Sequence, residues 1–440
     1  MNARLAALEI LMRYEKEGSK LDPLLLDVTK KSGAEEARDK AFIKKLVEGV
    51  VERLITLDYV TDLAASVKTA KMKPVIRMII RLGAYQILFM DRVPVSAAVN
   101  ESVKLAGIKG AGGLKGFVNG VLRGIAGLKE KGIEYPDSRT ECSFPEWIAK
   151  ILTDRYGAET AEKMMRAGVG RMPLYLRVNR CRIDTEDLKR ILSDRGIETK
   201  IVKPYTLRVL SGDLIPAEDE SFLAGMYSVQ DLSSQTAMYE LWERVKVYIN
   251  TTKTVNINVL DLCAAPGGKT CFLAEAIEGN TDLIQGSCHQ ITSCDISEKK
   301  LEKIRENLER TEIGNVEVRI KDALEYDPGL EKSADIIIAD LPCSGLGVLG
   351  RKVDIKYRVK PGDIRSLCEL QRGILDNASR YLKPGGILLF SVCTVTMEET
   401  VHQTDYITKK GLHKLEERQL LQGVDDCDGF YYALFDKPEK

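Results

Sequence analysis

The sequence predicts a multidomain chain with an all-α N-terminal domain, a small α+β module, and an α/β domain that has a doubly wound, mostly parallel sheet. Three observations predict this order. Apolar residues recur every three or four positions as far as about Gly127, β-like and helical segments mix over residues 144–240, and strand-length apolar runs alternate with amphipathic helices from about Val255. The length of 440 residues also fits about three domains of roughly 150 residues. We expect domains at residues 1–130, 144–240 and 241–440.

The helical prediction for the first region depends on apolar spacing and on helix breakers. Apolar residues fall on one helix face in two separate segments, Leu5, Leu8, Ile10 and Leu11, then Phe42, Ile43, Leu46 and Val50. The pairs Asp22-Pro23, Lys73-Pro74 and Val93-Pro94 mark helix ends between such segments. Several consecutive helices are therefore expected here.

The two following regions contain strands. The β-like runs Leu174–Val178 and Tyr205–Leu210 flank a helix that ends near Gly196. Further along, five strand-length runs alternate with helices: Val255–Leu262, Ile291–Asp295, Val316–Ile320, Ala334–Asp340 and Ile387–Cys393. Gly429–Phe435 is expected to add a closing antiparallel strand. Because parallel strands end at one edge of their sheet, the residues after them are expected to line a ligand site.

Charge is balanced over the chain and uneven along it. Lys and Arg number 65, as do Asp and Glu, and charged residues make up 30% of the chain. This excludes a polyelectrolyte tail or a wholly basic coat for nucleic acid. Residues 1–140 carry 24 basic and 17 acidic side chains, or +7, which leaves −7 for residues 141–440. If a nucleic acid binds, the N-terminal third is the better candidate to meet its phosphates.

Other features of the composition exclude further classes of protein. The first residues carry frequent charges and no signal-peptide cleavage site, and the most apolar stretch, Val75 to Met90, is interrupted by Arg77 and Arg81. We therefore expect a cytoplasmic protein with no membrane partner. Ten cysteines without a C-x-x-C pair, together with three histidines, predict reduced thiols and no metal site.

The segment Asp261-Leu-Cys-Ala-Ala-Pro-Gly-Gly-Lys-Thr270 joins a predicted strand to a predicted helix through small residues, which leaves backbone N–H groups free for a ligand. As a phosphate loop it has the right end, but Cys263 stands where the first glycine belongs and Pro266 lies inside it. It also lacks the G-x-G-x-x-G spacing of a dinucleotide site. A loop that holds an adenosyl group and an amino-acid tail fits better, because no pyrophosphate has to be bound.

Further acids follow the next two predicted strands. Asp295 follows Ile291–Cys294, and Asp322 follows Val316–Lys321. A carboxylate after the second strand can accept both ribose hydroxyls, and one after the third can reach the adenine amino group. Isolated acids in such loops are most often helix caps, and Asp295 is also placed to be one. The regular order of the acids favours the nucleoside site.

Two cysteines are expected at the same edge of the sheet. Cys343 stands in Asp340-Leu-Pro-Cys-Ser-Gly-Leu-Gly347, directly after one strand, and Cys393 ends the next. A free cysteine in an apolar strand is by default a small buried hydrophobic residue. Placement at the carboxyl ends of strands, beside an acid, favours a chemical role instead. From the residues alone, either sulfur can be the nucleophile.

The combination of DLCAAPGGKT (261–270), DLPCSGLG (340–347) and SVCT (391–394) resembles the RNA cytosine-C5 methyltransferases that use S-adenosylmethionine. Residues 255–435 look like their Rossmann-like catalytic domain. Upstream, Leu176–Asn179 and Tyr227–Ser234 resemble their RNA-binding module, and Arg81–Leu88 and Phe117–Arg123 resemble a NusB-type helical domain. This three-part order is similar to the bacterial 16S ribosomal RNA methyltransferases of the RsmB, Sun or Fmu type.

The resemblance implies a mechanism and a set of site residues. Cys393 is expected to add to C6 of cytosine, Cys343 to assist product release, and Asp340 to bind the N3/N4 edge of the base. S-adenosylmethionine is the expected cofactor, held by Cys263, Ala264, Ala265, Pro266, Gly267, Gly268, Lys269, Asp295, Asp322 and Asp340. DNA cytosine methyltransferases use the cysteine of a Pro-Cys pair, which would be Cys343, but the likeness to the RNA enzymes favours Cys393. Val392 and Thr400 depart from the family pattern, where Thr and Asn are usual at these positions.

The expected function is methylation of C5 of a specific cytosine in 16S ribosomal RNA, with an unpaired or extruded base as substrate and a monomeric enzyme. Two alternatives remain open at this point. One is the same chemistry on another RNA such as tRNA. The other is a non-catalytic NusB-like factor that binds RNA or acts in antitermination.

Overall fold

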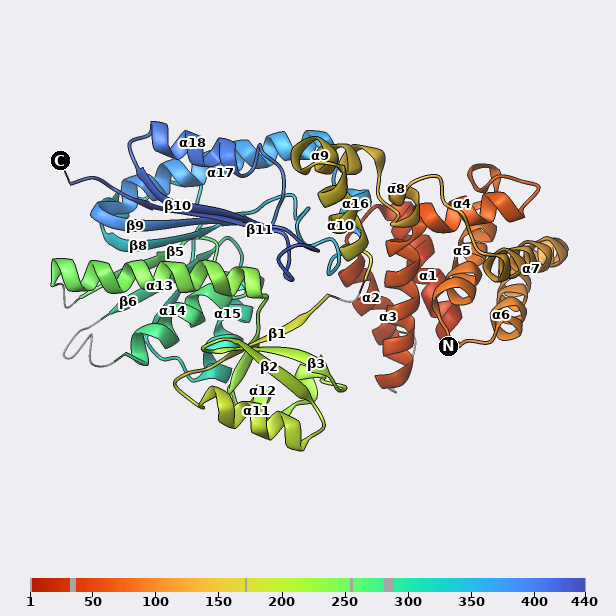
Figure 1. Cartoon of the computed structure of the whole chain (residues 1–440), viewed down its shortest axis with the longest axis horizontal. Helices are drawn as coiled ribbons and strands as arrows, with labels where there is room; N and C mark the ends of the chain where they lie inside the picture. Colours follow the sequence, from red (N-terminus) through yellow and green to blue (C-terminus); the bar gives the residue numbers. More distant parts are fainter. Residues whose placement is uncertain (1, 32–36, 171, 254–255, 281–288, 440) are drawn as a thin grey trace. The chain divides into compact units, whose positions relative to one another are not determined.

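The computed structural model describes residues 2–31, 37–170, 172–253, 256–280 and 289–439 (Figure 1). Its contacts divide the chain into two compact units. The first unit comprises Met1–Gly170 and Leu349–Lys360, and the second comprises Arg171–Val348 and Pro361–Lys440. The predicted active-site cysteines and acids all belong to the second unit.

The first unit is built from helices. They are α1 (Ala3–Glu17), α2 (Leu21–Lys31), α3 (Ala37–Glu52), α4 (Leu54–Ala64), α5 (Pro74–Phe89), α6 (Val95–Ile108), α7 (Lys115–Lys131), α8 (Ser138–Glu141), α9 (Glu146–Tyr156), α10 (Ala158–Ala167) and α16 (Ile355–Arg358). Short 3-10 turns lie at Thr69–Lys71 and Gly112–Leu114. The prediction of an all-α N-terminal region is confirmed.

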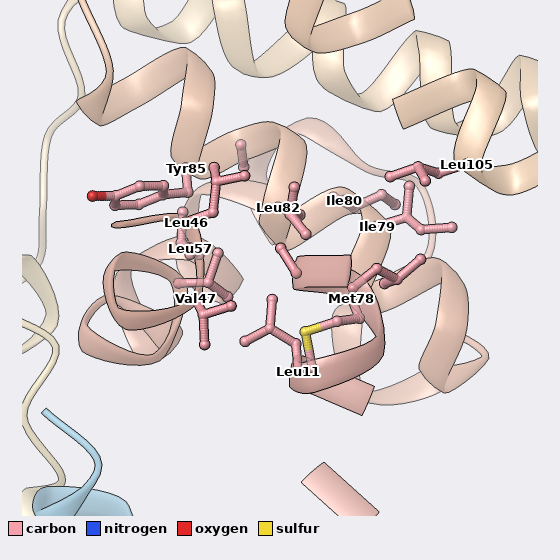
Figure 2. Close-up of a cluster of buried hydrophobic side chains, with 14 of the residues drawn as sticks. Leu11, Leu46, Val47, Leu57, Met78, Ile79, Ile80, Leu82, Tyr85 and Leu105 are labelled. Atoms are coloured by element: carbon pink, nitrogen blue, oxygen red, sulfur yellow. The ribbon is translucent and has the colours of Figure 1, made fainter. Parts of the chain in front are cut away.

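Helix α5 lies at the centre of the core of this unit. It begins with Pro74 in its first turn, where a missing N–H costs nothing, and its residues from Ile76 to Ile87 are mostly buried. Figure 2 shows Ile79, Leu82 and Tyr85 of this helix among side chains from neighbouring helices. Gly49 on α3 leaves space for the ring of Tyr85, since a Cβ there would lie 1.9 Å from Tyr85 Cζ. The helices therefore pack around α5 as one core.

The stretch Leu349–Lys360 is distant in sequence from the rest of the first unit and folds as part of it. Val353 is buried in the same core. The hydroxyl of Tyr357 donates to the carbonyl oxygen of Ser143 at 2.9 Å. The backbone N–H of Leu21 donates to a carboxylate oxygen of Asp354 at 3.4 Å. The N-terminal helices are thus completed by a segment from the second half of the chain.

The second unit contains a small antiparallel sheet of β1 (Leu174–Val178), β2 (Glu198–Lys203), β3 (Thr206–Ser211) and β4 (Tyr227–Val229), in the order β2-β3-β1-β4. Helices α11 (Thr185–Asp194) and α12 (Glu220–Leu223) connect its strands. Leu176, Leu188 and Leu207 belong to its buried core. The predicted α+β module is confirmed.

The large sheet follows, with the order β10-β11-β9-β8-β5-β6-β7. Its elements in chain order are α13 (Leu232–Thr252), β5 (Asn258–Asp261), α14 (Gly268–Glu278), β6 (Gln290–Asp295), α15 (Glu298–Thr311), β7 (Val316–Ile320), β8 (Ala334–Asp340), α17 (Pro361–Tyr381), β9 (Leu382–Val392), α18 (Val401–Lys409), β10 (His413–Leu420) and β11 (Phe430–Asp436). Strands β5 to β9 pair in parallel, while β11 pairs antiparallel with both β9 and β10.

Both faces of the large sheet are covered by helices. On β8, Ile336 and Ile338 belong to one hydrophobic cluster with α13, α14 and α15, whereas Ile337 and Ala339 belong to another with α17 and α18. Figure 1 shows these two sets of helices on opposite sides of the sheet. A strand buried on both faces is an apolar run without alternation. The predicted doubly wound α/β architecture is therefore confirmed.

Some expected boundaries differ from the observed ones. The run Val255–Leu262 forms a shorter strand, β5, and Val255 itself lies outside the described residues. Strand β9 ends at Val392, so Cys393 stands in the loop after it. Strand β10 was not predicted. It is an edge strand with mostly exposed charged side chains, and it lacks the apolar alternation that marks a half-buried strand.

Candidate active site at the carboxyl edge of the large sheet

The loop between β5 and α14 is a tight turn of small residues. The N–H of Gly267 donates to the carbonyl oxygen of Ala264 at 2.6 Å, and Gly267 has a φ of +99°. This backbone conformation favours glycine, and a Cβ at Gly267 would also lie 3.3 Å from Ile304 Cγ2. Helix α14 starts directly after it at Gly268. Gly267 therefore lets the chain turn from strand to helix within a few residues.

Asp295 at the end of β6 is bound to this loop. Its side chain is 4% exposed. One carboxylate oxygen accepts a hydrogen bond from the N–H of Ala265 at 3.1 Å, and the other accepts from the N–H of Ile296 at 2.7 Å and from Lys300 Nζ at 2.9 Å. The acid thus fixes the loop after β5 relative to the end of the neighbouring strand.

Asp322 follows β7, the next strand along the sheet. One of its carboxylate oxygens accepts a hydrogen bond from the N–H of Leu324 at 2.9 Å, which closes a local turn. Its backbone carbonyl also accepts from the N–H of Glu325. Asp322 also lines the cleft described next.

A cleft of about 290 Å³ opens at this edge, close to the lower limit of about 300 Å³ for small-molecule pockets. The predicted residues that line it are Cys263, Ala265, Asp295, Asp322, Asp340, Cys343 and Cys393. The other predicted cofactor residues are not part of the lining: Ala264, Pro266 and Gly267 belong to the same turn, and Gly268 and Lys269 begin α14. Predicted residues from five separate segments therefore meet at one cleft.

The two predicted active-site sulfurs are adjacent in this cleft. Asp340 of β8 is in register with Ser391 of β9, and each strand continues into a loop that carries one cysteine. Cys343 Sγ lies 3.2 Å from Cys393 Sγ. The pKa of the Cys343 thiol is raised well above its usual value by this hydrogen bond, and further by burial and by the nearby charges of Cys393 and Glu399. Cys343 therefore remains a protonated thiol over the neutral pH range.

Asp340 stands beside the cysteines and is oriented by two partners. Lys269 Nζ donates to one carboxylate oxygen at 2.6 Å, and the hydroxyl of Ser391 donates to the other at 2.7 Å. The side chain of Lys269 is 9% exposed and that of Asp340 is 35% exposed. Lys269 thus contributes through its ion pair with Asp340, which lines the cleft, whereas Lys269 does not.

Several residues of the site were not predicted. Ile296, Lys300, Leu324, Leu370 and Ile374 also line the cleft. Ile296 is 56% exposed and Leu324 is 44% exposed, and each stands one or two residues after a predicted acid. An apolar residue after an acid at a strand end is a signal that was available in the sequence. Contacts from α17 gave no such signal, because they depend on how that helix packs.

Comparisons with known proteins agree with this architecture. The family described as 16S rRNA methyltransferase RsmB/F matches residues 250–436, the NusB family matches residues 1–127, and a ferredoxin-like domain of RsmF/B-like methyltransferases matches residues 144–210. Together with the fold, these matches define a methyltransferase with a Rossmann-like catalytic domain, a ferredoxin-like domain and a NusB-like domain.

Similar proteins that match over most of the chain give a more specific family assignment. The chain is 34% identical to the probable ribosomal RNA small subunit methyltransferase B of Bacillus subtilis (strain 168) over 401 residues, covering 89% of this chain and 85% of that one. It is 29% identical to the ribosomal RNA small subunit methyltransferase B of Vibrio vulnificus (strain YJ016), covering 99% and 100%. The crystal structure of PH0851 has a similar fold, with 21% identity, 99% coverage of each chain and a TM-score of 0.75. The chain belongs to the RsmB/F family of S-adenosylmethionine-dependent ribosomal RNA small-subunit methyltransferases.

Within the ranges given above, no group of three or more His, Cys, Asp or Glu side chains is arranged to hold a metal ion. Over the same ranges, no helix combines the length and the apolar character needed to cross a bilayer.

Proposed function

We propose that this chain methylates C5 of a cytosine in small-subunit ribosomal RNA through an intermediate in which Cys393 is bonded to C6 of the base. The observation that supports the proposal most directly is the 3.2 Å separation of the Cys343 and Cys393 sulfurs in a cleft that Asp340 also lines. A pair of sulfurs beside an acid matches a reaction that needs one nucleophile and one group for proton transfer.

The cleft also fits the cofactor of the family. Small side chains, Cys263 and Ala265, line the part next to the β5–α14 turn, so a nucleoside can approach the backbone closely. Asp295 and Asp322 supply carboxylate oxygens, which can accept hydrogen bonds from hydroxyl and amino groups. We assign the binding of S-adenosylmethionine to these residues and to the turn Ala264–Lys269. When bound there, the cofactor supplies the methyl group that C5 of cytosine accepts.

Cys393 acts as the nucleophile in the first step and as the leaving group in the last. Its thiolate forms a bond to C6 while N3 of the ring takes up a proton, which makes C5 electron-rich. After C5 carries the methyl group, a base removes the C5 proton, the C6–S bond breaks, the sulfur leaves as a thiolate, and N3 gives up the proton that it took up in the first step. Cys343, as a protonated thiol 3.2 Å away, is placed to donate a hydrogen bond to that leaving sulfur.

The roles of the two cysteines follow from their surroundings. The raised pKa of Cys343, caused first by its hydrogen bond to Cys393, makes Cys343 the poorer source of a thiolate. This favours Cys393 as the nucleophile. Asp340 is fixed by Lys269 and Ser391 in a partly exposed position, where it can bind the N3/N4 edge of a base stacked against the cysteines.

The test is covalent trapping on ribosomal RNA. With S-adenosylmethionine present, Cys343→Ala should accumulate RNA bonded to protein, seen as a slowly migrating band on a denaturing gel, because release is impaired. Cys393→Ala should show no band and no methyl transfer. Cys181→Ala removes an exposed thiol and should behave like the unchanged chain. A band with Cys393→Ala and none with Cys343→Ala would reverse the roles of the two cysteines. The absence of a band with either variant would contradict the covalent mechanism.

A further inference from the structure

Glu399 is a buried carboxylate behind the two cysteines, and the mechanism above does not use it. It stands shortly before α18 and is fully buried, with 0% exposure. One oxygen accepts hydrogen bonds from the N–H of Ser344 at 2.7 Å and from Gln371 Nε2 at 3.4 Å. The other accepts from the hydroxyls of Ser344 at 2.6 Å, Thr394 at 3.0 Å and Thr396 at 2.9 Å. One side chain therefore binds three different loops or helices.

Two of these partners directly follow the cysteines in sequence. Ser344 follows Cys343, and Thr394 follows Cys393. Their hydroxyls also lie 2.8 Å from each other. Gln371 adds a link, because its amide donates to the carbonyl oxygen of Pro342 at 2.9 Å. The positions of both sulfurs thus depend on one hydrogen-bonded group centred on Glu399.

The charge of Glu399 is not balanced by a cation. Within the described residues, its hydrogen-bond donors are one backbone amide, one side-chain amide and three hydroxyls, and it forms no ion pair. Burying a carboxylate without a cation is costly even when neutral donors surround it. A glutamine has nearly the same shape and would avoid that cost. The burial of a charge at this position therefore points to a role other than stability.

We propose that Glu399 is a positioning residue of this methyltransferase, holding Cys343 and Cys393 at reacting distance and directing the proton of the pair toward Cys343. The catalytic part of this inference rests on the proposed function. The positioning of the two sulfurs by Glu399 does not depend on it. A negative charge next to the Ser344 amide disfavours a second negative charge on the neighbouring Cys343 sulfur.

Other charged groups at the cleft do not replace this effect. The ionisable groups that raise the pKa of the Cys343 thiol are Cys393 and Glu399, and a backbone hydrogen bond of Gly345 lowers it. The remaining charged residues that line the cleft are Asp295, Lys300, Lys321, Asp322 and Asp340. Of these, Asp340 is paired with Lys269, and Asp295 is paired with Lys300. Within the described residues, Glu399 is the one carboxylate among the groups that act on the pKa of the Cys343 thiol, and it accepts a hydrogen bond from the backbone N–H of Ser344, the residue after Cys343.

The first measurement is turnover. Glu399→Gln should lower kcat for methyl transfer to ribosomal RNA by about 100-fold, because a small displacement of reacting groups costs about that factor. KM for RNA and the affinity for S-adenosylmethionine should change little. Glu398→Gln makes the same chemical change at the neighbouring, exposed residue and should keep the kcat of the unchanged chain. Equal kcat values for the two variants would overturn the proposal.

The second measurement follows the ionisation of the Cys343 thiol and needs no RNA. In a Cys393→Ser background, the rate at which iodoacetamide alkylates Cys343 is followed against pH by mass spectrometry of the peptide. Adding Glu399→Gln should move the midpoint of this profile down by about one pH unit or more, since a nearby like charge has been removed. Adding Glu398→Gln should leave it in place. An unchanged midpoint with Glu399→Gln overturns the charge role.

A further variant keeps the test decisive if Glu399→Gln fails to fold. Thr394→Val removes one hydroxyl donor and keeps the charge of Glu399. It should lower kcat several-fold and leave the alkylation midpoint of Cys343 unchanged, and a kcat equal to that of the unchanged chain would contradict the positioning role. A different result distinguishes this inference from the proposed function. If Cys343→Ala traps no RNA but Glu399→Gln shifts the alkylation profile, the covalent mechanism is wrong and the positioning of the sulfurs by Glu399 is still supported.

Discussion

Two buried glutamates of the second unit, Glu275 and Glu399, have opposite surroundings. Both are almost without solvent exposure, at 1% and 0%. Glu275 on α14 forms an ion pair with Arg177 of β1 at 2.9 Å, and both side chains are 2% exposed. Glu399 receives only neutral donors. Glu275 therefore connects two parts of the structure through an ion pair. Glu399, in contrast, positions the cysteines of the active site and carries its charge next to them.

The Arg177 region connects the small sheet to the turn that borders the cleft. Arg177 donates to the carbonyl oxygen of Gly268 at 2.5 Å and to Gln230 Oε1 at 2.9 Å, in addition to Glu275. Burial raises the pKa of Glu275, and Arg177 is the main group that opposes this rise. Here, therefore, the cation opposes the effect of burial on the pKa of the carboxyl group and fixes the start of α14.

The largest expected effect comes from removing this cation. Arg177→Met should lower the free energy of unfolding by about 3–5 kcal/mol, because it leaves the carboxylate of Glu275 buried and unpaired. Chemical denaturation of the full chain measures the loss. Combining Arg177→Met with Glu275→Met should recover part of it, since no isolated charge then remains. If Arg177→Met alone lowers the free energy of unfolding by less than about 1 kcal/mol, the proposed difference between the two glutamates is wrong.

The sequence predicted the fold and the edge of the site because both depend on local patterns. Strands buried on two faces produce apolar runs such as Ala334–Asp340, and the parallel arrangement brings their ends together. Asp295, Asp340 and Cys343 were found in this way, without knowledge of any contact between them. Their assigned roles remain predictions.

The contacts between distant segments could not be predicted in this way. Glu399 meets Ser344, and Arg177 meets Glu275, across gaps of 55 and 98 residues. Which side chains meet over such distances depends on helix packing and on the register of the sheets. No periodicity or spacing in one sequence encodes it. The pair Glu398-Glu399 also gave no indication of which glutamate is buried.

Asp261 offers an intermediate case, with fewer donors than Glu399 and no cation in direct contact. It is 1% exposed, one carboxylate oxygen accepts from the hydroxyl of Thr270 at 2.8 Å, and the other has no hydrogen-bond partner within the described residues. Burial raises its pKa to about 7 from 3.8.

This raised pKa predicts a pH dependence of stability. Between pH 3.8 and about 7, Asp261 holds a proton in the folded chain and has lost it in the unfolded chain, so the free energy of unfolding falls as pH rises through this window. The total fall is up to about 4 kcal/mol, at roughly 1.4 kcal/mol per unit of pKa shift. Asp261→Asn should remove this slope in denaturation curves recorded across the window. The exposed-site variant Glu398→Gln should retain it, and a slope shared by all three chains would show that Asp261 is not its source.

The smallest effect is expected for an ion pair with the same length and a different burial. Arg166 and Glu141 of the first unit also lie 2.9 Å apart, but their side chains are 48% and 38% exposed. Water screens the pair, and holding two long side chains in one geometry costs entropy, so Glu141→Gln should change the free energy of unfolding by less than about 1 kcal/mol. The same denaturation experiment compares it with Glu275→Gln, which should cost more because its arginine partner is buried. Similar losses for the two substitutions would mean that distance rather than burial sets the strength of these pairs, and the distinction between Glu275 and Glu399 would then lose its physical basis.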